Sequence, residues 1–125
     1  MDYTVYRATE AEKANISEDW GGLKWLAGER VGNADGLTLG RVIIKTGRRN
    51  PRHAHANCEE ALYLLAGRLR HTAGAEEVVL EAGDTIVIPA GVYHNAESTG
   101  EVDADMIVAY SSGTRQFEVE GGGLQ

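Results

Sequence analysis

The sequence predicts a single all-β domain, a sandwich or barrel of short strands that follows a short N-terminal helix or arm. Its 125 residues match the common size of one domain. After Asp19 no stretch has a helical period long enough to oppose this prediction. Short apolar or alternating runs instead follow one another, and glycine-rich turns separate them. In chain order, these runs are residues 23–26, 37–45, 61–65, 68–72, 78–80, 85–88 and 106–111.

Residues 1–22 form the expected N-terminal arm, and a short helix is predicted over residues 8–15. Thr9 and Glu12 have the spacing of a capping box, in which two side chains satisfy free backbone N–H groups. The arm also carries Trp20, and Trp25 follows soon after. Because a terminal strand needs cover, we expect these two indoles to pack against a partner subunit in a homodimer.

The conserved barrel is expected over residues 37–111, and a flexible tail over residues 118–125, where three glycines stand in a row. The whole chain, residues 1–125, is therefore predicted to be one domain. No repeat and no further low-complexity segment interrupts it.

Composition excludes several classes of function. The net charge is −7 and the pI about 5.0, so neither nucleic acid nor an anionic membrane surface is an expected partner. The single cysteine, Cys58, excludes an internal disulfide framework. The first residues lack the pattern of a secretory signal, and we expect a cytoplasmic protein.

Histidines carry the first indication of chemistry. His53 and His55 are two residues apart, so on a strand both imidazoles point to the same face. A turn at residues 56–58 would return the next strand beside the first and bring the Glu60 carboxylate to the same point. His94 adds a third imidazole. Three imidazoles and one carboxylate suit a divalent transition metal and leave coordination positions open.

The spacing around these residues is more specific than the residues themselves. Gly47 is followed after five residues by His53-Ala54-His55, after four more by Glu60 and after six more by Gly67. A second stretch has Gly83, Pro89, Gly91 and His94 at fixed intervals, and it ends on Ser98.

These stretches resemble the two motifs of the cupin superfamily, and the chain is similar to its small single-domain members of the cupin 2 type. The match is complete except that Ser98 stands where the second motif has Asn. The resemblance implies a jelly-roll β-barrel. It also implies that one divalent metal is held by His53, His55, Glu60 and His94.

Three neighbours of the motif residues have competing interpretations. Glu59 is the rival of Glu60, but neighbouring strand residues face opposite ways, and the spacing to Gly67 favours Glu60. His71 lies outside both motifs and is interpreted as a surface histidine on a strand. Cys58 is interpreted as a small turn residue, because no base partner for its thiol is evident.

Several residues are candidates for lining the site. Leu62 and Leu64 share the face of Glu60 and would give the metal an apolar wall. Arg41 would suit a substrate carboxylate if it faced inward, but the alternation of its strand does not decide its direction. Tyr63 and Tyr93 are candidate hydrogen-bond or proton donors, with core or interface packing as the alternative. Three arginines could guide an anion, or simply be solvated: Arg48, Arg49 and Arg52.

The resulting functional hypothesis is a metal-dependent enzyme that acts on a small organic molecule, with an anionic one among the candidates. The expected chemistry is that of a dioxygenase, a decarboxylase or lyase, or an isomerase. The expected cofactor is one divalent transition metal: Mn, Fe, Ni, Co, Cu or Zn. The alternative is a non-catalytic cupin that binds or senses a small molecule. A purely structural metal is disfavoured, because closed structural sites have four Cys or His ligands.

Overall fold

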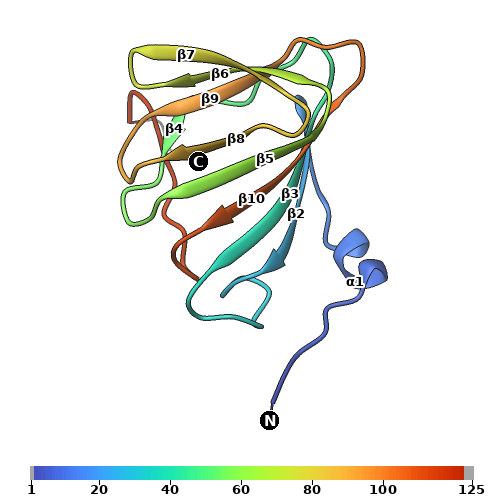
Figure 1. Ribbon diagram of the computed structural model, residues 1–125. Helices are drawn as coiled ribbons and strands as arrows, with labels where there is room; N and C mark the ends of the chain where they lie inside the picture. Colours follow the sequence, from blue (N-terminus) through green and yellow to red (C-terminus); the bar gives the residue numbers. More distant parts are fainter. Residues whose placement is uncertain (1, 123–125) are drawn as a thin grey trace.

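Two antiparallel β-sheets face each other in this computed structural model, which describes residues 2–122 (Figure 1). The larger sheet has the strand order β1-β2-β3-β10-β5-β8, and the smaller sheet has the order β11-β4-β9-β6-β7. The elements are α1 (Ala8–Lys13), β1 (Ile16–Glu18), β2 (Gly21–Ala27), β3 (Thr38–Ile44), β4 (His53–Ala54), β5 (Glu60–Ala66), β6 (Arg68–Ala73), β7 (Glu76–Glu81), β8 (Thr85–Ile88), β9 (His94–Ser98), β10 (Ala104–Tyr110) and β11 (Glu118–Val119).

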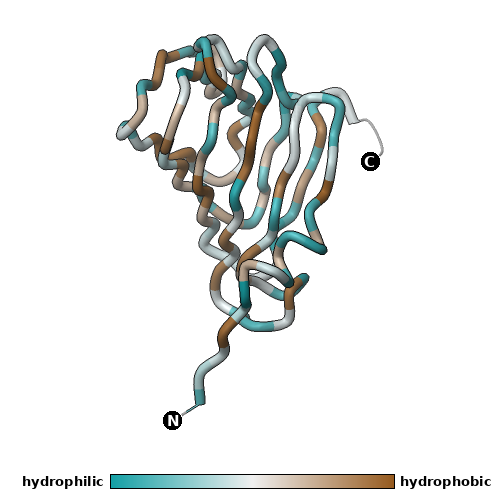
Figure 2. Tube along the Cα trace, turned by 90° about the vertical axis from the view of Figure 1, so that its right-hand side faces the viewer, coloured by the Kyte–Doolittle hydropathy of each residue, from teal (hydrophilic) through white to brown (hydrophobic). Residues whose placement is uncertain are grey.

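The core fills the space between the sheets, and it follows from alternation along the strands. In β3, the side chains of Val42 and Ile44 point inward and are buried, whereas Arg41 points outward and is exposed. The same period of two runs along β5 and β10, and Figure 2 shows hydrophobic and hydrophilic residues alternating along the strands. Leu64 and Leu69, one from each sheet, are fully buried, and each contributes about 1.5–3 kcal/mol through burial.

Each of the seven predicted runs coincides with a strand, and only residues 37, 45 and 111 fall outside it; the strands are β2, β3, β5, β6, β7, β8 and β10. The remaining strands lack an apolar run of their own. β9 reads His-Asn-Ala-Glu-Ser, and it is extended because it pairs with β6 on one side and β4 on the other. For such polar segments tertiary pairing decides the conformation.

Two expectations for the N-terminal arm are wrong. The helix α1 ends at Lys13 rather than at residue 15, and its N-cap is Arg7, with no side-chain capping bond. Thr9 lies inside this helix, where its hydroxyl cannot cap the first turn. The following segments, β1 and β2, form an antiparallel pair that extends the larger sheet, and α1 lies outside the sheets beside β2 (Figure 1).

Both tryptophans pack against the chain's own core, and their expected contact with a partner subunit stays a prediction. Trp25 is buried in the chain's own core, opposite Gly40 on β3, and Trp20 packs half-buried against the same core. A Cβ at Gly40 would lie 2.9 Å from the Trp25 ring, so the missing side chain makes room for the indole. Trp25 therefore needs no partner subunit to cover it.

The glycines of the two motifs shape turns, as expected. Gly67 has φ +86° and Gly91 has φ +81°, conformations that side-chain-bearing residues rarely adopt. At Gly67 a Cβ would also lie 2.8 Å from the Ala104 Cα, so this turn between β5 and β6 has no room for a side chain.

The expected flexible tail begins instead with the strand β11, which pairs with β4 (Figure 1). Residues 123–125 of that predicted tail lie outside the described residues. Within residues 2–122, no helix is long and apolar enough to cross a membrane.

Candidate metal centre

Four buried side chains converge between the two sheets. His53 begins β4 and His94 begins β9, and the two residues are direct partners across these neighbouring strands. His55 follows β4, and Glu60 begins β5. One ligand atom from each of the four lies within 4.8 Å of the others. The four residues predicted as metal ligands are therefore brought together.

The route of Glu60 to this cluster differs from the prediction. We expected the strand of Glu60 to lie beside the strand of His53. In the structure β5 pairs with β10 and β8 in the larger sheet, whereas β4 pairs with β9 and β11 in the smaller one. Glu60 thus faces the histidines from the opposite wall of the barrel.

Backbone carbonyls orient all three imidazoles. Each histidine places its Nδ1 at hydrogen-bond distance from a carbonyl oxygen, which can only accept. Nδ1 therefore carries the proton, and the lone pair of Nε2 points into the cluster. Such contacts fix the tautomer of metal-binding histidines. The pairs are His53 with Pro51 at 2.6 Å, His55 with Gln116 at 2.8 Å and His94 with Val92 at 2.8 Å.

The electrostatics keep the donors in the forms that bind a cation. Burial lowers the pKa of His53 to about 3, and the neighbouring His94 and His55 act in the same direction. Burial alone would raise the pKa of Glu60, but its contacts with His55 and His94 outweigh burial and hold that pKa well below its usual range. At neutral pH, His53 is neutral and Glu60 is ionised.

The cluster fits a metal better than it fits hydrogen bonding alone. Nε2 of His55 is buried and has no hydrogen bond within residues 2–122, although Oε1 of Glu60 lies 3.2 Å away. Nε2 of His94 lies 3.0 Å from the same oxygen. With Nδ1 already protonated, either contact would need a second proton on the ring. A divalent cation satisfies all these lone pairs at once.

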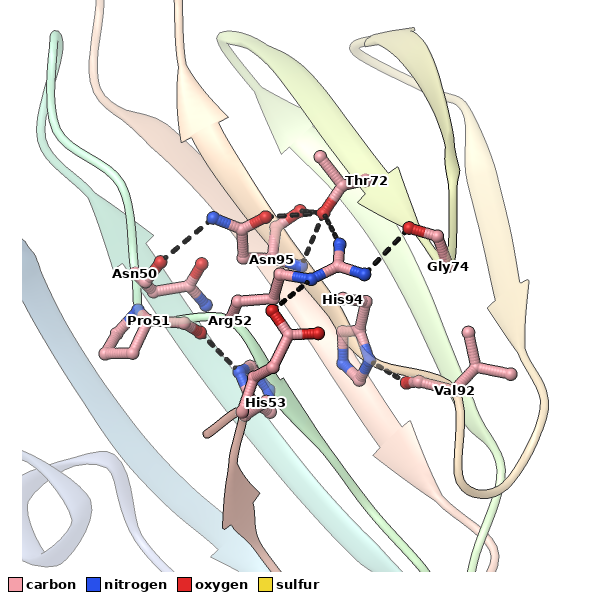
Figure 3. A network of polar contacts seen from close by, with 10 residues as sticks. Asn50, Pro51, Arg52, His53, Thr72, Gly74, Val92, His94 and Asn95 are labelled. Carbon is pink, nitrogen blue, oxygen red and sulfur yellow. Dashed lines mark hydrogen bonds and ion pairs between the residues drawn. The ribbon is translucent and has the colours of Figure 1, made fainter. Parts of the chain in front are cut away.

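A polar network holds the segment that carries His53 (Figure 3). The Asn95 amide donates to the Asn50 carbonyl at 3.2 Å, and its other end meets the Thr72 hydroxyl. Arg52 donates to the same hydroxyl at 3.0 Å, and to Glu120 and to the carbonyl of Gly74. Arg52 is therefore a structural anchor here, while Arg48 and Arg49 are exposed.

Two cavities adjoin the cluster. A small one of about 40 Å³ is lined by Glu60, Leu62, His71 and His94 among others, so the expected apolar wall is present at Leu62. A larger one of about 450 Å³ reaches His53 and has room for a small organic molecule. Trp20, Leu23 and Phe117 give this larger cavity aromatic and aliphatic walls.

The other predicted site residues lie away from the cluster. Arg41 is on the outer face of β3, where its Nε donates to Asp105 at 2.9 Å, so the inward orientation is wrong. Tyr63 is 44% exposed on the outer face of β5. Tyr93 precedes β9 and is half-buried outside the four-residue cluster; its pKa is raised by desolvation and by Glu118.

The competing interpretations have clear outcomes. Glu59 is exposed and Glu60 buried, as parity predicted. His71 is not a surface residue: it is 1% exposed, and its ring stacks on that of His94 with centroids 5.9 Å apart. Burial, followed by the nearby His94, lowers the pKa of His71 to about 4. Cys58 is buried, and burial raises its pKa, so its thiol stays protonated.

Three residues around the site were not predicted. The ring of Tyr110 packs against His55 with centroids 4.9 Å apart, and Phe117 stacks on His53 at 4.7 Å. Arg115 lies over several aromatic rings. Alternation along residues 106–111 indicates that Tyr110 shares the inward face of Met106. No pattern in the sequence indicates where Phe117 and Arg115 lie, because both follow the last strand of the larger sheet.

Comparison with known proteins identifies the family of this chain. The family model described as "Cupin domain" matches residues 40–110, more than half of the chain. Germin-like protein 3-8 of Oryza sativa subsp. japonica is 36% identical over 85 residues, which are 64% of this chain and 38% of that protein. An uncharacterised protein of Methanocaldococcus jannaschii is 35% identical over 65 residues, 52% of each chain. The chain spans about two fifths of the germin-like relatives that it matches.

Solved structures share the fold. Oxalate decarboxylase from Bacillus subtilis superposes with a TM-score of 0.81 at 17% identity, over 89% of this chain and 31% of that one. An oxalate oxidase superposes with a TM-score of 0.72 at 23% identity, over 81% of this chain and 55% of that one. The Bacillus subtilis oxalate decarboxylase has Mn(II) centres. At these identities the similarity establishes the fold alone.

Proposed function

Because this chain belongs to the cupin family, we propose that it is a metal-dependent enzyme that acts on a small organic molecule. One observation carries the proposal: three Nε2 lone pairs and one carboxylate meet beside a cavity of about 450 Å³ that reaches His53. A ligand set with a free coordination side next to an organic-sized cavity is typical of a catalytic metal site.

His53, His55, Glu60 and His94 would hold the metal. A divalent transition metal bound there would supply Lewis acidity to an oxygen of the substrate, or redox chemistry if it is iron, copper or manganese. The backbone carbonyls keep each imidazole in the metal-binding tautomer. The apolar walls of the cavity exclude water from a bound molecule, which strengthens its polar contacts.

The reaction classes that this arrangement suits are dioxygenase, decarboxylase or lyase, and isomerase chemistry. Six metals tolerate the donor set: Mn, Fe, Ni, Co, Cu and Zn. Manganese is the first to test, because oxalate decarboxylase with Mn(II) centres shares this fold. The alternative is a cupin that binds or senses a small molecule without turnover.

Metal content of the protein as purified, measured by plasma mass spectrometry, tests the proposal. We expect about one equivalent of a transition metal in the wild type. His53→Ala and His94→Ala should each lose most of it, because each removes an inward Nε2. His71→Ala is the matched control, since it removes a neighbouring buried imidazole that is outside the ligand set, and it should retain the metal.

Two results would contradict the assignment. The first is a wild type that takes up none of the six metals on dialysis. The second is a His94→Ala variant that retains the metal while His71→Ala loses it. Turnover of small carboxylic acids and diketones by the loaded protein then separates an enzyme from a binding protein.

We also infer a homodimer, which light scattering after size-exclusion chromatography tests. Tyr63, Leu65 and Val87 are exposed on the outer faces of the neighbouring strands β5 and β8. Exposed apolar side chains that gather on one sheet face are typical of an interface. A single mass of about 13.5 kDa across concentrations would contradict it. Cytoplasmic location stays a prediction.

A further inference from the structure

Arg115 is a cation near the site that is not one of the candidate metal ligands. Its Cζ lies 4.6 Å from the centroid of the Trp25 ring and 5.2 Å from those of Tyr110 and Phe117. The flat guanidinium is thus held among three aromatic faces, which leaves its N–H groups pointing outward from its edge. No acidic side chain within residues 2–122 forms an ion pair with it.

The guanidinium of Arg115 has one polar contact within residues 2–122, and this contact does not satisfy its donors. Nη1 of Arg115 lies 3.3 Å from Nδ1 of His55. That nitrogen already donates its proton to the carbonyl of Gln116 at 2.8 Å, so it has no lone pair for Arg115. The donors of a half-buried guanidinium are therefore unfilled, and an arginine has five of them.

Arg115 lines the larger cavity, where its donors could meet a bound molecule. Arg115 and His53 both line the cavity of about 450 Å³, and the apolar side chains of Leu23 and Phe117 line it as well. A molecule in the cavity would therefore meet both a cation and one of the candidate metal ligands. The acidic side chain that lines it, Glu18, is exposed, as is a second cation, Arg30.

We propose that Arg115 binds the carboxylate of the substrate, and that the substrate is a monocarboxylate with an apolar or aromatic body. A carboxylate matches the fork of a guanidinium with two parallel hydrogen bonds. The cavity is several times larger than a two-carbon diacid needs, and its walls favour an apolar body. Arg115 is then a specificity-determining residue of the same site, so this inference rests on the proposed function.

Paired ligands test the proposal: phenylacetate, and phenylacetamide as its neutral counterpart. Trp20 and Trp25 line the cavity, so tryptophan fluorescence reports occupancy directly. We expect the wild type to bind phenylacetate more tightly than phenylacetamide. Arg115→Met should weaken phenylacetate about 10-fold to 100-fold, the range for a hydrogen-bonded charge, and leave phenylacetamide within about twofold.

Two further variants separate charge recognition from packing. Arg48→Met removes an exposed arginine outside the cavity and should change the affinity for neither ligand. Arg115→Lys keeps the charge without the planar fork, and should retain part of the preference for the acid. It also provides the measurement if Arg115→Met does not fold. Equal weakening of both ligands by Arg115 substitution would overturn the proposal, because it means that Arg115 only packs the cavity.

The two proposals can fail separately. Metal content is measured in the same samples, and each titration is repeated after chelation. If chelation abolishes the preference for phenylacetate and Arg115→Met does not alter it, the metal binds the carboxylate and this inference is wrong. If the protein holds no metal yet shows an Arg115-dependent preference, this inference stands and the enzymatic proposal fails.

Discussion

Acid should weaken this protein through His71, and the effect can be measured by removing that side chain. His71 is 1% exposed, and its Nδ1 is buried with no hydrogen-bond partner in the described part of the chain. Burial first, and then the neighbouring His94, lower its pKa from 6.5 to about 4. As the pH falls, the unfolded chain therefore takes up a proton before the folded chain does, and folding stability declines through this window.

The magnitude follows from the two pKa values. Linkage gives a loss from His71 of about 1 kcal/mol at pH 5.5 and about 3 kcal/mol at pH 4, relative to neutral pH. His71→Leu has a similar volume and cannot titrate, so it should lack this loss. The rest of the chain is the same in both proteins, so the difference between the two isolates His71.

Urea denaturation of the metal-free proteins, followed by tryptophan fluorescence from pH 7.5 down to pH 4, measures this difference. We expect the free energy of unfolding of the wild type to fall by about 3 kcal/mol more than that of His71→Leu between pH 7.5 and pH 4. Parallel curves for the two proteins would refute the reasoning, since they would mean that His71 has the same pKa folded and unfolded.

Other substitutions and additions have expected outcomes that follow from single contacts. Adding the metal to the metal-free protein at about 1,000 times its dissociation constant should raise the Tm by about 15 °C. The rise should be smaller in acid, because protons compete with the metal for Nε2. Scanning calorimetry measures both effects. Arg41→Ala should cost less than about 1 kcal/mol in urea denaturation, because its pair with Asp105 is solvent-exposed, and a larger loss would mean a hidden role. Gly113→Ala should destabilise the fold by about 1–3 kcal/mol, because its Cβ would lie 2.1 Å from the Asp35 carbonyl oxygen; an unchanged Tm would contradict this close approach.

The sequence alone determined the strands, the motif turns and the four candidate metal ligands. Strands such as β3 and β5 were predictable because each is a short apolar or alternating run bounded by turn residues, which is local information. The ligands were predictable because they stand at fixed intervals in the sequence: one residue separates His53 from His55, and six residues separate Glu60 from Gly67. Both kinds of information lie within short stretches of the chain.

Only the tertiary structure decided which sheet carries each ligand and what surrounds the site. Glu60 faces the histidines from the opposite sheet, and His71 is buried behind His94, because distant strands pair there. The stack of Arg115 on Trp25 joins the two ends of the chain in the same way. These contacts depend on long-range pairing and side-chain packing, which no local period or spacing encodes.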